Sequence, residues 1–301
     1  MQSLCRICIM VHGMIEKVYF LLEEQWYKKC LPEAAAAVLR YREYGLDADL
    51  MVIEAGDELP EPEFAALYIA DSERMLCLLS GMEAAFCGYS HAGNPQEDLG
   101  LADYVLMEPQ WVDRDSLVKI WQRQRRLPWT ILETARCVVR EFVPEDLEAI
   151  RALYDKEAEK YLEAPSEDLR KERKILAAYI DRVYRLCGYG HWAVLLRETG
   201  ELIGRIGFSF PDASAPGPVP DASFGYLVHR AHRGRGIARE VCAALLDYGF
   251  AQLGFEMIGA DAAVSNEASG KLLRSFGFRE VAEREDQRYY ILHKNEWSYI
   301  L

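Results

Sequence analysis

A short stretch between two apolar segments carries four arginines and two glycines, although the chain has a formal net charge of −13. It reads HRAHRGRGIARE and runs from His229 to Glu240. A strand-like segment precedes it and a helix-like segment follows, so Gly234 and Gly236 fall at the start of the helix. Free main-chain N–H groups, the helix dipole and the lack of Cβ atoms favour a bound phosphate there. The stretch therefore predicts a pyrophosphate-binding loop.

Two familiar phosphate-binding patterns fit this stretch poorly. A Walker loop requires GxxxxGK[ST], but the chain's one Gly-Lys pair, which begins at Gly270, is followed by Leu272. A dinucleotide fingerprint requires GxGxxG, and Arg239 stands where its third glycine belongs. Asp261, beyond the next expected strand, is a weak substitute for the acid that binds ribose in that fold. A third pattern is needed.

The segment from Arg233 to Ala238 reads R-x-x-G-x-A after a strand that ends in Tyr-Leu-Val. It resembles the acyl-CoA loop of the GNAT N-acetyltransferase superfamily. CVVREFVPED, from Cys137 to Asp146, resembles that family's first strand and its turn into the first helix. VSNEASGKLLRSFGF, from Val264 to Phe278, resembles its N-x-x-S segment. The resemblance extends from about residue 134 to residue 301 and is closest to the branch of the ribosomal-protein N-terminal acetyltransferases.

This resemblance implies an acetyl-CoA-dependent N-acetyltransferase, in which a primary amine attacks the thioester directly in a ternary complex. The acceptor would be a protein N-terminus or a small amine. The strand edge at Leu227 and Val228 would pair with the pantetheine, and the Val228 N–H would face the thioester oxygen. Asn266 would bond the pantetheine or the neighbouring strand, unless it is an ordinary helix N-cap. The pyrophosphate would lie on the main chain of Arg233, Gly234, Arg235, Gly236, Ile237 and Ala238.

Two proton-transfer side chains that are frequent in the family are missing. Ser223 stands where relatives often have a glutamate, and Leu273 stands where many have a tyrosine. We predict Asp221 as the general base and Ser269 as the general acid, because an α-amine with a pKa of about 8 needs only a modest base. The missing groups leave a second interpretation open, a non-catalytic acyl-CoA-binding sensor. Other possible bases are Glu285 and Asp286, and more distant acids are Tyr289 and Tyr290.

The fold class expected for the whole chain is α/β, in two domains. Pro128 ends a charged helix and an extended segment follows, which places a boundary near residue 130. In residues 1–130, strand-like and helix-like segments alternate, which predicts a Rossmann-like domain with a parallel sheet covered on both faces. In residues 131–301 we expect the mixed α/β domain of the GNAT family.

Residues 67–106 resemble the last third of haloacid-dehalogenase-like (HAD-like) phosphatases, in which an acidic pair holds Mg²⁺. Asp71 stands at the end of the corresponding strand, but Met75 replaces the second acid and no D-x-D-x-[TV] motif occurs upstream. Without the nucleophilic aspartate no aspartyl-phosphate forms. We interpret the front domain as a degenerate HAD-like scaffold for binding or docking, with Asp71 as a helix N-cap.

Composition limits the remaining function classes. The chain has 301 residues, 50% of them hydrophobic and 28% charged, without an apolar run of the roughly 20 residues that a membrane span requires. Eight irregularly spaced cysteines suit reduced thiols, so we expect a cytoplasmic protein. Cys5 and Cys8 have CxxC spacing but suit the core of a first strand, and we predict no metal. The acidic balance argues against a nucleic acid partner; a homodimer is left open.

Overall fold

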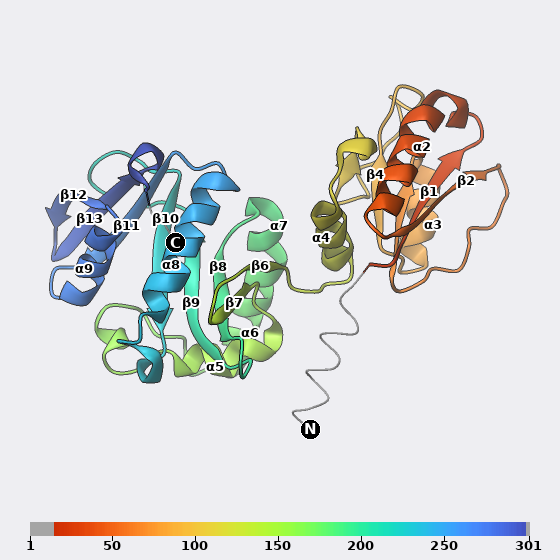
Figure 1. Ribbon diagram of the computed structural model, residues 1–301. Coiled ribbons are helices and arrows are strands. Elements are labelled where there is room, and N and C mark those ends of the chain that lie inside the picture. Colours follow the sequence, from red (N-terminus) through yellow and green to blue (C-terminus); the bar gives the residue numbers. More distant parts are fainter. Residues whose placement is uncertain (1–14, 299–301) are drawn as a thin grey trace. The chain divides into compact units, whose positions relative to one another are not determined.

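The computed structural model describes residues 15–298, so the Cys5–Cys8 pair lies outside the described residues. The chain divides into two compact units between Trp129 and Thr130. Figure 1 shows both units coloured along the sequence. No helix within residues 15–298 combines the length and the apolar character needed to cross a bilayer.

The front unit is a five-stranded parallel sheet with helices on both faces, which confirms the predicted parallel sheet. Its strand order is β2-β1-β3-β4-β5. The packed apolar side chains place α2 and α4 on one face and α3 on the other. The strands are β1 (Lys17–Glu23), β2 (Asp47–Ile53), β3 (Ala66–Ala70), β4 (Phe86–Tyr89) and β5 (Val105–Leu106); the helices are α2 (Tyr27–Glu43), α3 (Glu73–Gly81) and α4 (Arg114–Gln124).

The start of α3 corrects one prediction. The predicted N-cap Asp71 is wrong, because the side chain of Ser72 accepts the hydrogen bond from Met75 N. Asp71 instead accepts a hydrogen bond from Glu23 N, at the end of the neighbouring strand β1. A serine hydroxyl suffices for an N-cap, which leaves the adjacent carboxylate for the sheet edge.

The second unit contains an eight-stranded sheet of order β12-β13-β11-β10-β9-β8-β7-β6. All neighbouring pairs are antiparallel except β10 and β11. The strands are β6 (Thr130–Glu133), β7 (Cys137–Arg140), β8 (His191–Leu196), β9 (Leu202–Ser209), β10 (Ala222–Val228), β11 (Met257–Ala263), β12 (Arg279–Arg284) and β13 (Gln287–His293). The helices are α5 (Leu147–Ala152), α6 (Leu169–Ala178), α7 (Tyr184–Cys187), α8 (Ile237–Ala251) and α9 (Glu267–Ser275).

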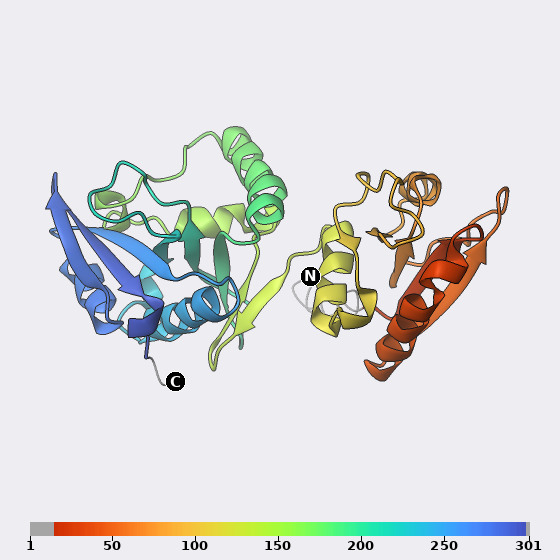
Figure 2. The same ribbon diagram turned by 90° about the horizontal axis from the view of Figure 1, so that it is seen from above.

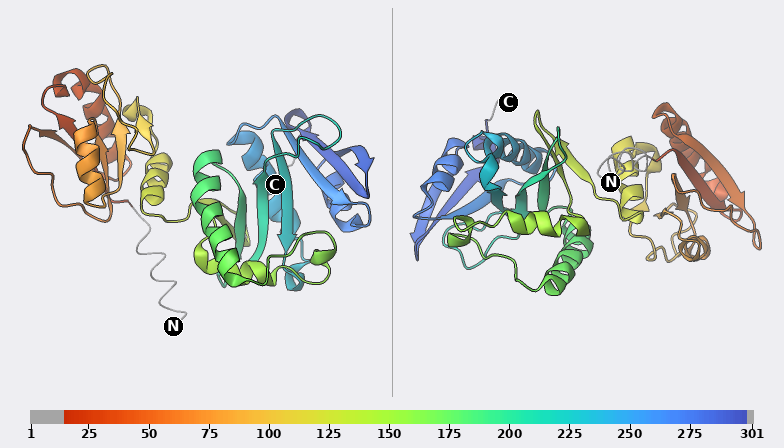
Figure 3. Two further views of the ribbon diagram at one scale, coloured as in Figure 1. Left: turned by 180° about the vertical axis from the view of Figure 1, so that it is seen from behind. Right: turned by 90° about the horizontal axis from the view of Figure 1, so that it is seen from below.

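Helices cover both faces of this sheet. Figures 2 and 3 show α6 and α7, in green, on one face and α8, in blue, on the other. The parallel pair β10 and β11 is joined only near its start, Ala222 with Ile258 and Ser223 with Gly259, and the strands then separate. Such a gap in the middle of a sheet leaves main-chain groups of both strands without strand partners.

Two helical segments precede β8, and both are irregular. The first is short: α5 has only six residues, because the Asp155 carboxylate accepts hydrogen bonds from Glu157 N and Ala158 N and starts a separate turn. The second runs from α6 through a π-helical stretch, Tyr179–Val183, into α7. A π turn shifts the register of the side chains that follow it, which places residues five apart on one side.

Candidate active site

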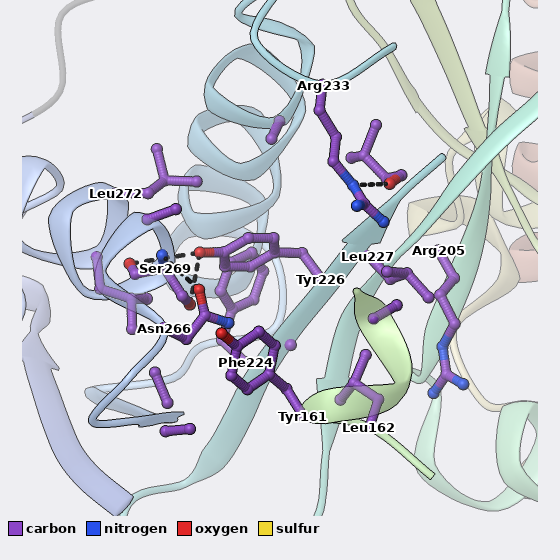
Figure 4. Close-up of a pocket in the computed structure, with 18 of the residues that line it drawn as sticks. Tyr161, Leu162, Arg205, Phe224, Tyr226, Leu227, Arg233, Asn266, Ser269 and Leu272 are labelled. Atoms are coloured by element: carbon purple, nitrogen blue, oxygen red, sulfur yellow. Dashed lines mark hydrogen bonds between the residues drawn. The ribbon is translucent and has the colours of Figure 1, made fainter. Parts of the chain in front are cut away.

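A cavity of about 760 Å³ opens where β10 and β11 separate. Its walls come from β10, the following loop, the start of α8, the end of β11, α9 and the segment between α5 and α6. Figure 4 shows ten labelled side chains of this wall, with Tyr161 pointing toward Asn266 at the start of α9.

The arginine and glycine loop presents unpaired main-chain donors to this cavity. Gly234 and Gly236 have φ angles of +74° and +76°, which side-chain-bearing residues rarely adopt. Gly236 is the N-cap of α8 and provides no side chain to accept from the first turn. Within the described chain, no hydrogen bond is recorded from the N–H groups of residues 234–238. The loop therefore has free donors at a positive helix end, which fits a pyrophosphate.

Two arginines hold the loop in place. The Arg233 Nε donates to the Val228 carbonyl at 2.9 Å, and its guanidinium pairs with Asp155 at 3.1 Å and Glu157 at 3.2 Å. Arg136, from the turn before β7, donates to the Arg235 carbonyl at 2.8 Å and pairs with Glu240 of α8. These side chains position the loop through contacts to its carbonyls, so its N–H groups stay available.

The edge of β10 supplies further donors. His229 N–H donates to the Ile203 carbonyl of β9 at 2.8 Å. Because N–H directions alternate along an antiparallel strand, the N–H groups of Tyr226 and Val228 point the other way, into the gap beside β11. An extended amide-bearing ligand can pair with this edge as an added strand does.

Helix α9 faces that edge from the far side of the gap. The Asn266 Oδ1 accepts from Ser269 N at 3.1 Å, so Asn266 is the N-cap of α9. The Ser269 hydroxyl lies 2.8 Å from the Tyr226 hydroxyl, as Figure 4 shows. Burial raises the pKa of Tyr226, which keeps the phenol protonated. The protonated pair can therefore donate hydrogen bonds to a ligand or relay a proton inside the cavity.

Two titratable side chains lie on the sheet face that carries α5 and α6. Ile258 packs against α8, and because residues alternate along a strand, Asp261 points to the opposite face. Desolvation raises the pKa of the Asp261 carboxyl, and the Asp212 carboxylate raises it further. His191, at the start of β8, also lines the cavity, and desolvation and the Arg205 cation lower its pKa to about 3. At neutral pH the cavity thus contains a strengthened base and an uncharged imidazole.

Comparison with known proteins decides the family. Residues 136–279 match the family described as "Acetyltransferase (GNAT) domain". The uncharacterized N-acetyltransferase YoaA of Bacillus subtilis (strain 168) is 32% identical over 151 residues, which are 50% of this chain and 83% of that protein. The uncharacterized N-acetyltransferase p20 of Bacillus licheniformis is 32% identical over 152 residues, 50% of this chain and 82% of its own.

The chain belongs to the GNAT acetyltransferase family. It is an acetyltransferase enzyme of a family that uses acetyl-CoA as co-substrate. Among solved structures, the ribosomal-protein-S5-alanine acetyltransferase of Vibrio fischeri is similar, with 18% identity, a TM-score of 0.47 and coverage of 56% of this chain and 98% of its own.

The acetyltransferase cavity brings together most of the residues singled out in the sequence. Its wall contains Leu227, Val228, Asn266 and Ser269, and five residues of the loop: Arg233, Gly234, Gly236, Ile237 and Ala238. Arg235 is in the loop but is not among the wall residues. Their roles toward acetyl-CoA stay predictions.

Asp221 lies elsewhere. The Asp221 Oδ2 accepts hydrogen bonds from Glu256 N at 2.8 Å and from Met257 N at 2.9 Å. Asp221 is not among the described residues that line the cavity. The carboxylate ties the start of β10 to the start of β11, which is a structural use of an acid. The alternation of side chains along β10 places Asp221 on the same face as Ser223. Alternation does not show how far the start of the strand lies from the cavity.

The sequence analysis did not name three residues of the cavity that could take part in catalysis. Tyr226 looked like part of an apolar strand, His191 like the first residue of one, and Asp261 was considered only as a ribose ligand. One signal could have found Asp261: it is the one charged residue in MIGADAA, the β11 sequence, and a lone charge in such a strand marks an open face.

The front unit contains a group that could supply metal ligands. Ligand atoms of Cys30, Asp71 and His91 all lie within 4.8 Å of one another, and all three residues are buried. However, Gly93 N donates to the His91 Nδ1 at 3.0 Å, so the His91 Nε2 carries the proton and donates to the Asp71 Oδ2 at 3.2 Å. An imidazole in this tautomer has no free lone pair for an ion.

Proposed function

We propose that the second unit transfers an acetyl group from acetyl-CoA to a primary amine by direct attack in a ternary complex. The observation that carries the proposal is one cavity that joins three elements: the free N–H groups at α8, the open edge of β10 and the carboxylate of Asp261. Acetyl-CoA supplies an activated thioester; the residues of the chain bind it, remove a proton and return one.

The loop and the strand edge bind the co-substrate. The N–H groups of residues 234–238 would hold the pyrophosphate, and the free edge of β10 would pair with the pantetheine amides. Val228 N–H points into the gap and would donate to the thioester oxygen as charge develops on it. The Nδ2 of Asn266 has no recorded partner in the described chain and stays available for the pantetheine.

Proton transfer would involve residues on both sides of the gap. As the amine nitrogen forms its bond to the acetyl carbon, Asp261 accepts the proton that the nitrogen loses. When the carbon–sulfur bond breaks, Ser269 donates a proton to the thiolate and recovers one from the Tyr226 hydroxyl at 2.8 Å. Solvent in the open cavity then returns a proton to Tyr226 and takes up the proton held by Asp261. A raised pKa suits Asp261 for its role, because a stronger base removes the ammonium proton more readily.

A thiol-release assay tests the proposal. Purified full-length protein is incubated with acetyl-CoA and, one at a time, an alanyl tetrapeptide, spermidine, lysine and kanamycin. We expect amine-dependent release of free thiol with at least one of them. A flat trace for every amine, together with calorimetric binding of acetyl-CoA, would contradict transfer and support the non-catalytic sensor. Absence of acetyl-CoA binding would reject both.

For the front unit we propose a degenerate HAD-like scaffold that binds or docks and does not transfer phosphoryl groups. Glu23 ends β1, where such a phosphatase needs its nucleophile, and its carboxylate already accepts from the Ser72 hydroxyl at 2.9 Å and from the Arg74 Nε at 3.0 Å. We expect no turnover of p-nitrophenyl phosphate with Mg²⁺. Turnover that is lost in a Glu23→Gln variant would reject this proposal.

A further inference from the structure

The imidazole of His191 lies across a trough on one face of the sheet, a row of residues without side chains. Under the proposed function the acceptor approaches this face. His191 of β8 pairs with Gly207 of β9, and Gly207 pairs with Gly225 of β10. Two adjacent glycines in one row leave no side chains beside His191 on this face. The Nε2 atom therefore reaches β10, 3.0 Å from the point where a Cβ of residue 225 would stand.

The main chain of His191 is held by two tyrosines. The Tyr179 hydroxyl accepts from His191 N at 2.6 Å, and the Tyr184 hydroxyl donates to the His191 carbonyl at 2.7 Å. These tyrosines are five residues apart, and the π-helical stretch between them puts both rings on one side, with centroids 5.3 Å apart. At Gly190 a Cβ would come within 2.7 Å of the Tyr179 hydroxyl, so this close contact requires glycine.

The ring itself is left without a hydrogen-bond partner. In the part of the chain that the structure describes, no hydrogen bond is recorded for either ring nitrogen of His191. Two tyrosines, Gly190 and the glycine trough thus position a polar group whose partner is missing from the protein. The half-buried ring lines the cavity, so a ligand bound there can supply this partner.

The position of the ring indicates which ligand supplies the missing hydrogen bond. Gly225 and Asp261 lie on the face of the sheet that carries α5 and α6, whereas the loop at α8 belongs to the other side. Acetyl-CoA held at α8 reaches the gap from the side of α8, and the amine is left with the side that holds His191 and Asp261. Next to Gly225 the amine nitrogen would stand beside the Nε2 atom and at the open edge of β10.

We propose that His191 is a positioning residue for the acceptor: its Nε2 accepts a hydrogen bond from the amine N–H and aims the nitrogen lone pair at the thioester carbon. This inference rests on the proposed function. His191 loses and gains no proton; the proton released from nitrogen goes to Asp261.

The charged and titratable groups around the ring favour this use over a base. Arg205 of β9 lines the same cavity, and its Nη1 donates to the Tyr154 hydroxyl at 2.7 Å. Tyr179 and Tyr184 contact His191 from the helical side. Asp261 of β11 and Glu163 of the segment after α5 line the same cavity. Because burial and the Arg205 cation lower the pKa of His191 to about 3, the ring is uncharged at neutral pH.

The test uses His191→Phe, which fills the trough without a hydrogen-bond acceptor, and His191→Gln, which restores an acceptor at similar reach. The amine probe is the one among the alanyl tetrapeptide, spermidine, lysine and kanamycin that gives the fastest thiol release. We expect His191→Phe to lower kcat/KM for this amine about 10- to 100-fold, the size of a lost orienting contact. Calorimetric Kd for acetyl-CoA should stay within about twofold. His191→Gln should recover most of the loss.

Two further variants separate positioning from a merely structural role. Gly225→Ala retains the imidazole but pushes it aside, so it should reproduce the His191→Phe defect toward the amine. His293→Phe makes the same substitution at an exposed histidine, the last residue of β13, and should leave both parameters unchanged.

The pH profile separates positioning from proton transfer. We expect kcat/KM of His191→Gln to follow the same pH dependence as the wild type, scaled down. A flattened profile would show that His191 is the base and would overturn the inference. Equal kinetics of His191→Phe and wild type would also overturn it while leaving the proposed function intact; no thiol release by the wild type would instead reject the proposed function.

Discussion

The two units each contain a cluster of polar side chains at the place where their fold usually binds ligands, and the clusters differ in what the polar groups contact. In the front unit, Asp71 and His91 lie at the carboxyl ends of parallel strands, where open α/β sheets bind ligands. There the groups contact one another: Asp71 with His91 and Glu23 N, and Asn94 with the Asp71 and Tyr89 carbonyls.

The acetyltransferase cavity keeps its polar groups available. The loop N–H groups, the edge of β10 and the His191 ring have no recorded partners among the described residues. The comparison teaches that a site is recognised less by which polar residues gather than by which of them lack partners, because a satisfied network gains nothing from a ligand. Four predictions test this contrast.

The largest effect is expected at the base. Asp261→Asn should lower kcat about 10²- to 10⁴-fold, because the amide cannot accept the amine proton. In the wild type, lowering the pH protonates Asp261 and stops activity. Because the pKa of Asp261 is raised above the ordinary value of 3.8, this loss occurs at a higher pH than for an ordinary aspartate. Thiol release across pH measures both. Asp212→Asn is the matched control: it should move this fall to lower pH with kcat unchanged at neutral pH. An unchanged kcat in Asp261→Asn would remove the base assignment.

A smaller effect is expected at the loop. Gly236→Val places a branched side chain at φ +76°, where an L-residue costs about 1–2 kcal/mol, and it also blocks a close approach of phosphate. The Kd for acetyl-CoA by calorimetry should rise about 10- to 100-fold. Gly254→Val has a similar φ of +72° beyond the other end of α8 and should destabilise the fold without changing this Kd. Equal Kd values for both variants would contradict the phosphate cradle.

Removing either hydroxyl of the proposed proton donor should have a smaller effect than the loop substitution. Ser269→Ala and Tyr226→Phe should each lower kcat about tenfold, or about 1.4 kcal/mol in barrier, because the hydroxyls work as one relay. For the same reason the double variant should be little slower than either single one. Single-turnover thiol release measures the three rates. Multiplicative losses would show that the hydroxyls act independently.

The front unit should have no effect on the transfer rate. Asp71→Ala leaves Glu23 N and the His91 Nε2 proton buried without an acceptor, which should destabilise the fold by about 1–3 kcal/mol. Thermal unfolding of the full chain measures this loss, and kcat/KM at a temperature where the variant is folded should equal that of the wild type. A rate that falls in parallel would show that the front cluster takes part in the chemistry.

Much of the fold followed from sequence because its signals are local. The alternation of apolar strands and helices in residues 17–124 predicted a parallel sheet, and the glycines before α8 predicted a loop with free N–H groups. The helix before β8 was less predictable, because a π turn leaves no distinct pattern in its residues.

The candidate site also has a part that could be predicted from the sequence and a part that could not. Ser269, Asn266 and the loop follow a spacing along the chain, so the sequence alone could name them. The cavity position of Asp261, the distance of Asp221 from it and the reach of His191 over Gly225 depend on where β10 leaves β11 and on which rows of the sheet lack side chains. The sequence determined the two sheets, the family and the glycine loop before α8, since each depends on neighbours in the chain. Only the tertiary structure decided which polar groups stay without partners, because a partner can come from any segment that folding brings near.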